Sequence, residues 1–110
     1  MKRYQGKRTC GQAVVTVNDR ALNPRFDLRM HSPSGFEWGY GGSGPAQLAL
    51  ALLADHLGNA AKALDLYQDF KFAVVVGLPR DGWVLSTEQI DQALAALKPG
   101  TPAAGVALKR

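Results

Sequence analysis

The amino-acid sequence predicts an α+β fold, with a small antiparallel sheet of three or four strands, mostly N-terminal, packed against about three helices. Two observations lead to this prediction. Apolar and polar side chains alternate in much of the N-terminal part, as they do in half-buried strands. After the glycine-rich residues 41–44, apolar side chains instead recur every three or four positions, as they do in helices. With 110 residues, of which 46% are apolar, the chain suits one core that needs no disulfide or metal.

Strands are predicted at residues 4–9, 13–17, 26–30, 36–40 and 83–85. Residues 13–17 are rich in valine and threonine, which favour strands. In residues 26–30 and 36–40 every second side chain is apolar or aromatic, so these side chains share one face of a strand. We expect Trp38 and Trp83 to pack in the core beneath the helices, and Tyr4 and Tyr40 to be exposed.

The first helix is predicted from the glycine-rich segment to about Leu57. Pro45 suits the first helical position, because its missing N–H group would have no partner there in any case. Ser43 or Gly44 would then be the N-cap residue. An apolar stripe with several alanines follows, and Gly58 marks the end of the helix.

Two further helices complete the prediction. The second begins near Ala60, and residues 72–76 are compatible with helix or with a buried strand; the helical spacing continues into them, which favours helix. Ser86 and Gln89 form a capping box that opens the third helix. We place the domain at residues 1–97 and expect a Pro/Ala/Gly-rich C-terminal tail at residues 98–110.

The composition favours a cytoplasmic protein without a membrane anchor. No apolar run follows the first residues, as a signal peptide would require, and no stretch approaches the ~20 apolar residues that span a bilayer. Cys10 is the one cysteine, so it cannot form an internal disulfide.

Positive charge is concentrated in the N-terminal third. The net charge is +4, and residues 1–30 hold seven basic side chains against two acidic ones. A basic face can bind nucleic acid or an acidic protein, and a solvated strand surface would have the same composition. The candidate partner-binding residues are these seven, with a tyrosine as an exposed aromatic: Lys2, Arg3, Tyr4, Lys7, Arg8, Arg20, Arg25 and Arg29.

The glycine-rich segment is a second candidate site, for an anion or a nucleotide. Backbone N–H groups at a helix N-terminus lack helical partners and lie at the positive end of the helix dipole. The segment lacks the Gly-Lys-Ser/Thr of a P-loop, and no βαβ unit follows its spaced glycines. A tight strand-to-helix turn explains the glycines more simply. The candidate anion-binding residues are Gly41, Gly42, Ser43 and Gly44.

We recognise no catalytic or metal-binding constellation in the sequence. Ser43 does not lie in G-x-S-x-G, and a catalytic triad would have to use His31 or His56. His56 lies on the apolar stripe, which is typical of a core or boundary histidine. The histidines, Cys10 and the carboxylates show no metal-ligand spacing. We therefore predict a non-enzymatic protein with no cofactor and no metal.

The run W-G-Y-G-G-S-G-P-A-Q-L-A-L-A-L-L, followed by Y-Q-D-F-K at residues 67–71 and W-x-L at 83–85, resembles a family of small bacterial proteins of unknown function. The resemblance covers residues 2–97. It implies a compact α+β module without an assigned activity, cofactor or catalytic residue. Members occur often on plasmids, phages and integrative elements, which implies an accessory or counter-defence role. Phe72 and Ala73 depart from the polar helix surface that we expect there.

Taken together, these observations predict an interaction protein that binds a macromolecular partner, possible roles being a mobile-element accessory factor or an inhibitor. The alternatives are nucleic-acid binding by the basic residues and anion or nucleotide binding at residues 41–44. A protein partner is the leading expectation, and we expect no membrane partner.

Overall fold

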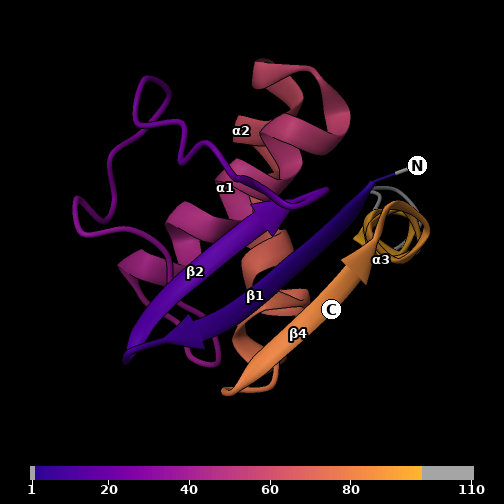
Figure 1. Cartoon of the computed structure of the whole chain (residues 1–110). Coiled ribbons are helices and arrows are strands. Elements are labelled where there is room, and N and C mark those ends of the chain that lie inside the picture. The colour runs from indigo at the N-terminus through magenta and orange to yellow at the C-terminus, as the bar shows by residue number, and fades with distance from the viewer. Residues whose placement is uncertain (1, 98–110) are drawn as a thin grey trace.

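The computed structural model describes residues 2–97, which form a four-stranded antiparallel sheet and three α-helices (Figure 1). The strands lie in the order β3-β2-β1-β4, with bounds β1 Arg3–Thr9, β2 Gln12–Val17, β3 Arg20–Ala21 and β4 Gly82–Ser86. The helices are α1 Ser43–Leu57, α2 Ala60–Ala73 and α3 Thr87–Leu97, and a short 3-10 turn, η1, spans Val75–Gly77. The predicted α+β class is confirmed. The predicted tail at residues 98–110 lies outside the described residues.

The molecule has two layers, because α1 and α2 lie together against one face of the sheet (Figure 1). α3 follows β4 directly and lies at the end of that strand. The side chains of β1 alternate between the two faces: Tyr4 and Gly6 are buried under the helices, whereas Arg3 and Lys7 are exposed on the opposite face. The opposite face has no helix of the described chain over it (Figure 1).

The core lies between the sheet and α1, which is buried along most of its length. Trp38 and Trp83 meet edge to face, with ring centroids 5.6 Å apart, and both are almost fully buried. This confirms the expectation that the two tryptophans pack in the core. The indole of Trp83 lies directly against Gly6 of β1, where no side chain would fit.

Two predicted strands are absent from the described structure: residues 26–30 and 36–40 belong to an irregular connection between β3 and α1. Arg25 adopts a left-handed backbone conformation, with φ of 58°, and its carbonyl accepts from the N–H of Leu28, so a turn forms instead of a ladder. The alternating apolar side chains still have a physical role, because Leu28 and Phe36 pack against the core. Met30 and Tyr40 are exposed, so the period of two matches burial in part of these segments only and involves no strand pairing.

Gln47 of α1 replaces the missing strand pairing with side-chain hydrogen bonds. Its Oε1 accepts from the backbone N–H groups of His31, at 2.7 Å, and Ser32, at 3.2 Å. Its Nε2 donates to the carbonyls of Pro24, at 2.6 Å, and Arg29, at 3.0 Å. The side chain is fully buried and forms bonds through both ends of its amide. One buried amide thus fastens the connection to the helix.

The helix boundaries differ from the prediction at one end. α1 begins at Ser43, and Gly42 is its N-cap residue, so the prediction of Ser43 or Gly44 as the N-cap was wrong. Pro45 is the third residue of the helix, whereas we predicted it to be the first. Gly58 ends α1 in the left-handed conformation, as predicted.

The later elements agree with the sequence. α2 ends at Ala73 and η1 follows, so the strand alternative for residues 72–76 is wrong. The capping box forms, because Gln89 N–H donates to Ser86 Oγ and Ser86 N–H donates to Gln89 Oε1. Within residues 2–97 no helix is long and apolar enough to cross a membrane.

Candidate functional site

The first group of candidate residues, the basic ones, is divided between two environments. Three of the seven cations form ion pairs inside the chain. The ammonium group of Lys2 lies 3.1 Å from the carboxylate of Asp55. Arg25 binds Asp27 with two hydrogen bonds of 3.0 Å, which lower the pKa of Asp27. The third pair joins Arg8 to Glu37 and is the most constrained of the three.

Arg8 is held on three sides. Its guanidinium donates to both carboxylate oxygens of Glu37, at 2.9 and 3.2 Å, and through Nε to the carbonyl of Arg80 at 2.9 Å. The guanidinium carbon also lies 4.6 Å from the ring centroid of Trp38, a cation–π arrangement. The hydrogen bonds from Arg8 lower the pKa of Glu37. Arg8 therefore serves the fold and has little freedom to contact a partner.

The prediction that Tyr4 is an exposed contact residue is wrong. Its ring is fully buried on the helix side of β1, and its hydroxyl donates a 2.7 Å hydrogen bond to Asp55 of α1. The alternation of β1 explains this, since residue 4 points to the face opposite Arg3. Tyr40 is 49% exposed, as predicted.

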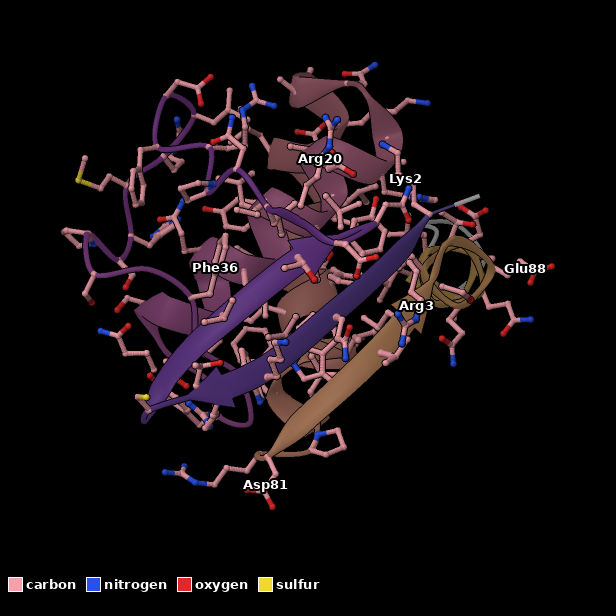
Figure 2. The ribbon with its side chains drawn as sticks, viewed as in Figure 1. Lys2, Arg3, Arg20, Phe36, Asp81 and Glu88 are labelled. Atoms are coloured by element: carbon pink, nitrogen blue, oxygen red, sulfur yellow. The ribbon has the colours of Figure 1, made fainter. Side chains whose placement is uncertain are left out.

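The remaining cations are exposed and lie in different places. Arg3 and Lys7 share the uncovered face of the sheet, whereas Arg20 lies on the edge strand β3 and Arg29 on the connection before α1. Figure 2 shows Arg3 over the strands on the side away from α1 and α2, with Arg20 apart from it, above the end of β2. The predicted basic face is therefore not one continuous surface of seven cations.

The uncovered sheet face places valine side chains beside Lys7 and Gln5. Lys7 pairs with Val14 of β2, and Gln5 pairs on its other side with Val84 of β4. Val84 is 45% exposed. The strands place only basic charges on this face, Arg3 and Lys7, and no aromatic ring. We call Arg3, Gln5, Lys7, Val14 and Val84 together the open face.

The second group, the glycine-rich segment, borders a polar cavity of about 410 Å³. Ser43 and Gly44 line the cavity at the start of α1, whereas Gly41 and Gly42 are not part of its lining. Gly41 faces the ring of Phe72, and Gly42 faces the ring of Tyr40. Two of the four candidate anion-binding residues thus meet at one cavity, and the other two accommodate aromatic rings.

The two histidines lie apart, and each has one polar partner. His31 Nε2 lies 2.7 Å from the hydroxyl of Tyr67, and His56 Nε2 lies 2.6 Å from the carboxylate of Asp91. Neither is bonded to a serine or to Cys10, which is exposed in the β1–β2 turn. Among residues 2–97 no group of three or more His, Cys, Asp or Glu side chains is arranged to hold a metal ion.

The layers and surfaces define a small two-layer α+β domain whose antiparallel sheet is open on one face. Within that class, the chain belongs to the family of unknown function DUF6166, whose model matches residues 4–96. The predicted membership of a family of unknown function is therefore confirmed. No curated protein and no solved structure matches the chain.

Proposed function

We propose that this protein is a non-enzymatic interaction domain that binds an acidic surface of a partner protein through the open face. The observation that supports the proposal is the charge of this face. No helix among residues 2–97 covers it (Figure 1), and its charged side chains, Arg3 and Lys7, are both basic and exposed. A basic patch attracts an acidic partner and sets the register of docking.

The neighbours of the two cations favour a protein over a nucleic acid. Val14 lies beside Lys7, and Val84 lies beside Gln5 and is almost half exposed. Protein interfaces are enriched in arginine, and their buried centre is more apolar than the rest of the surface. Single-stranded nucleic acid is usually bound by aromatic rings that stack on bases, and duplexes by many free cations. The open face has no ring, and three of the seven predicted cations are neutralised in ion pairs.

The proposal extends to the setting of the protein. The resemblance of the sequence to proteins carried on mobile elements supports an accessory or counter-defence role, with a component of a host complex as the partner. The single cysteine supports a cytoplasmic location. Inhibition by occupying the partner's acidic surface would need no catalytic residue.

The test is a capture experiment with matched variants. Tagged wild-type protein, an Arg3→Glu/Lys7→Glu variant and a Lys62→Glu/Arg29→Glu control are incubated with nuclease-treated bacterial lysate, and bound proteins are quantified by mass spectrometry. Each double variant changes the net charge equally, and all four side chains are exposed. The control charges lie on α2 and on the connection before α1, away from the open face.

We expect one lysate protein to be captured in equal amounts by wild type and by the control. The amount captured by the open-face variant should be lower by at least about tenfold. Binding of that lysate protein to the purified domain should then be measured directly. Equal capture by all three forms, or no captured protein, would contradict the proposal. Recovery of nucleic acid without nuclease, with an affinity that falls linearly on a log–log plot against salt, would instead favour the nucleic-acid alternative.

A further inference from the structure

The polar cavity at the start of α1 has no role in the proposed function. It lies between the β1–β2 turn, the connection before α1, and the first residues of the helix. Its walls include Gln12, Ser32, Ser34, Tyr40, Ser43 and Gly44. The open face does not contribute Arg3 or Lys7 to it, so the two surfaces can be tested separately.

Helix α1 opens into this cavity without a cap. Gly42 at the N-cap position has no side chain, no side-chain hydrogen bond caps the helix, and its first turn contains no acidic residue. The backbone N–H groups of Ser43 and Gly44 have no acceptor within residues 2–97. α1 has 15 residues and is buried for most of them, so its dipole is poorly screened by water. The unpaired N–H groups and the helix dipole therefore favour a negatively charged group at this end of the helix.

Ser32 supplies an independent indication of a ligand. Only 8% of this residue is exposed, yet its hydroxyl has no hydrogen-bond partner among the described residues. Ser32 lines the cavity, and Gln47 fixes its backbone N–H at 3.2 Å. The hydroxyl is not sealed in the interior, because Trp83 Nε1 is the one fully buried polar side-chain atom without a partner among residues 2–97. It therefore reaches the cavity that Ser32 lines, where a bound group can accept its hydrogen bond.

The charge balance of the cavity does not oppose an anion. Glu37 is the one charged residue in its lining, and its carboxylate is occupied by two hydrogen bonds from Arg8. The ion pair lowers the pKa of Glu37 and carries no net charge. Apart from the side chains of Ala13 and Phe36, the remaining lining consists mainly of hydroxyl, amide and backbone groups, which can donate hydrogen bonds.

We propose that this cavity binds the phosphate group of a small organic phosphate. The N–H groups of Ser43 and Gly44 and the hydroxyls of Ser32 and Ser43 donate hydrogen bonds to the phosphate oxygens. The volume of about 410 Å³ lies within the range of small-molecule pockets and exceeds the need of a bare phosphate ion. The organic part would therefore lie toward Gln12 and Tyr40.

The test uses two probes, inorganic phosphate and ribose 5-phosphate, each titrated at constant ionic strength. The readout is the amide chemical shift of Ser43 and Gly44 in two-dimensional NMR spectra. We expect saturable shifts of both amides, with ribose 5-phosphate bound at least about tenfold more tightly than inorganic phosphate. Equal affinity would assign the site to free phosphate and overturn the organic part of the proposal. The absence of saturation at tens of millimolar for both probes would overturn it entirely.

A Ser43→Asp variant separates binding from folding. An acidic side chain in the first turn stabilises a helix, so the melting temperature should not fall. The same charge repels phosphate, so the affinity should drop by at least about tenfold. Ala61→Asp places an equal charge in the first turn of α2, where Ala61 is exposed, and should leave phosphate binding unchanged. Equal weakening by both variants, or by neither, would show that binding does not occur at this cavity.

Discussion

The hydroxyl of Tyr4 donates a 2.7 Å hydrogen bond to the carboxylate of Asp55, which also lies 3.1 Å from the ammonium group of Lys2. This contact joins β1 to the last turn of α1, across the interface of the two layers. Burial, with help from the hydrogen bond to Asp55, raises the pKa of Tyr4 well above its usual value. The hydroxyl therefore remains a donor across the ordinary pH range.

Replacing Tyr4 with phenylalanine should lower the free energy of unfolding by about 1–3 kcal/mol, because a buried bond to a charged acceptor is lost. Urea unfolding measures this change. Tyr40→Phe is the matched control, since its ring is 49% exposed and its hydroxyl has no hydrogen-bond partner within the described chain. The control should differ from wild type by less than about 0.5 kcal/mol. Similar losses in the two variants would mean that the Tyr4 bond adds nothing.

Gln47 carries the second prediction. Gln47→Leu keeps a similar volume but leaves two backbone N–H groups and two carbonyls of the connection before α1 without their partner. Each unpaired buried group costs about 1–3 kcal/mol, so we expect a loss of at least about 3 kcal/mol. Hydrogen exchange at the amides of His31 and Ser32 should become faster than exchange in β1.

Gln68→Leu is the control for this variant, because Gln68 is exposed on α2. It should leave the exchange rates of His31 and Ser32 unchanged. If Gln47→Leu unfolds the protein, Gln47→Glu is the second variant, since a carboxylate can still accept from the two N–H groups but cannot donate to Pro24 and Arg29. Gln47→Glu should then lower the free energy of unfolding while His31 keeps its protection. Unchanged protection of His31 in Gln47→Leu, or unchanged stability in Gln47→Glu, would refute the role of Gln47.

The same residue shows where sequence reasoning reached its limit. The helices, β1, β2 and β4 could be predicted because periodicity and capping signals are local. The connection before α1 could not, because its alternating apolar side chains match a strand pattern while Gln47, a residue distant in sequence, provides the hydrogen bonds. A lone glutamine within an apolar helix was the available signal.

The candidate sites could also be predicted only in part, because composition is visible in the sequence but tertiary contacts are not. Composition located the basic region and the glycine-rich helix start, and each has exposed residues, although Tyr4 and Gly44 are buried. It could not show which cations pair with acids, since Arg8 meets Glu37 and Lys2 meets Asp55 only through tertiary structure. Ser32 also gave no sequence signal, because its burial depends on the path of the connection before α1.

The Arg8–Glu37 pair predicts how stability depends on pH. The pKa of Glu37 is lower in the folded chain than in the unfolded chain, so the unfolded state binds a proton first. The stabilisation is therefore fully present above the usual glutamate pKa of 4.5 and is lost as the pH falls through the lowered value. The melting temperature of wild type should exceed that of Glu37→Gln at pH 7, and the difference should vanish in acid.

Glu88→Gln is the control for this titration, because Glu88 is exposed on α3 and forms no ion pair within the part of the chain that the structure describes. Its difference from wild type should vary with pH much less than that of Glu37→Gln. A difference for Glu37→Gln that stays constant from pH 7 into acid would show that the pair does not stabilise the fold.

Gly6 and Trp83 provide the last prediction. Gly6 lies on the helix side of β1, and a Cβ atom there would overlap the indole of Trp83, which pairs with it across the strands. Gly6→Ala should therefore cost about 1–3 kcal/mol through overpacking, measured by urea unfolding. Gly77→Ala, which meets open space, should change stability by less than about 1 kcal/mol. In a Trp83→Phe background the smaller ring leaves room, so the alanine should cost less; an undiminished cost there would place the clash elsewhere.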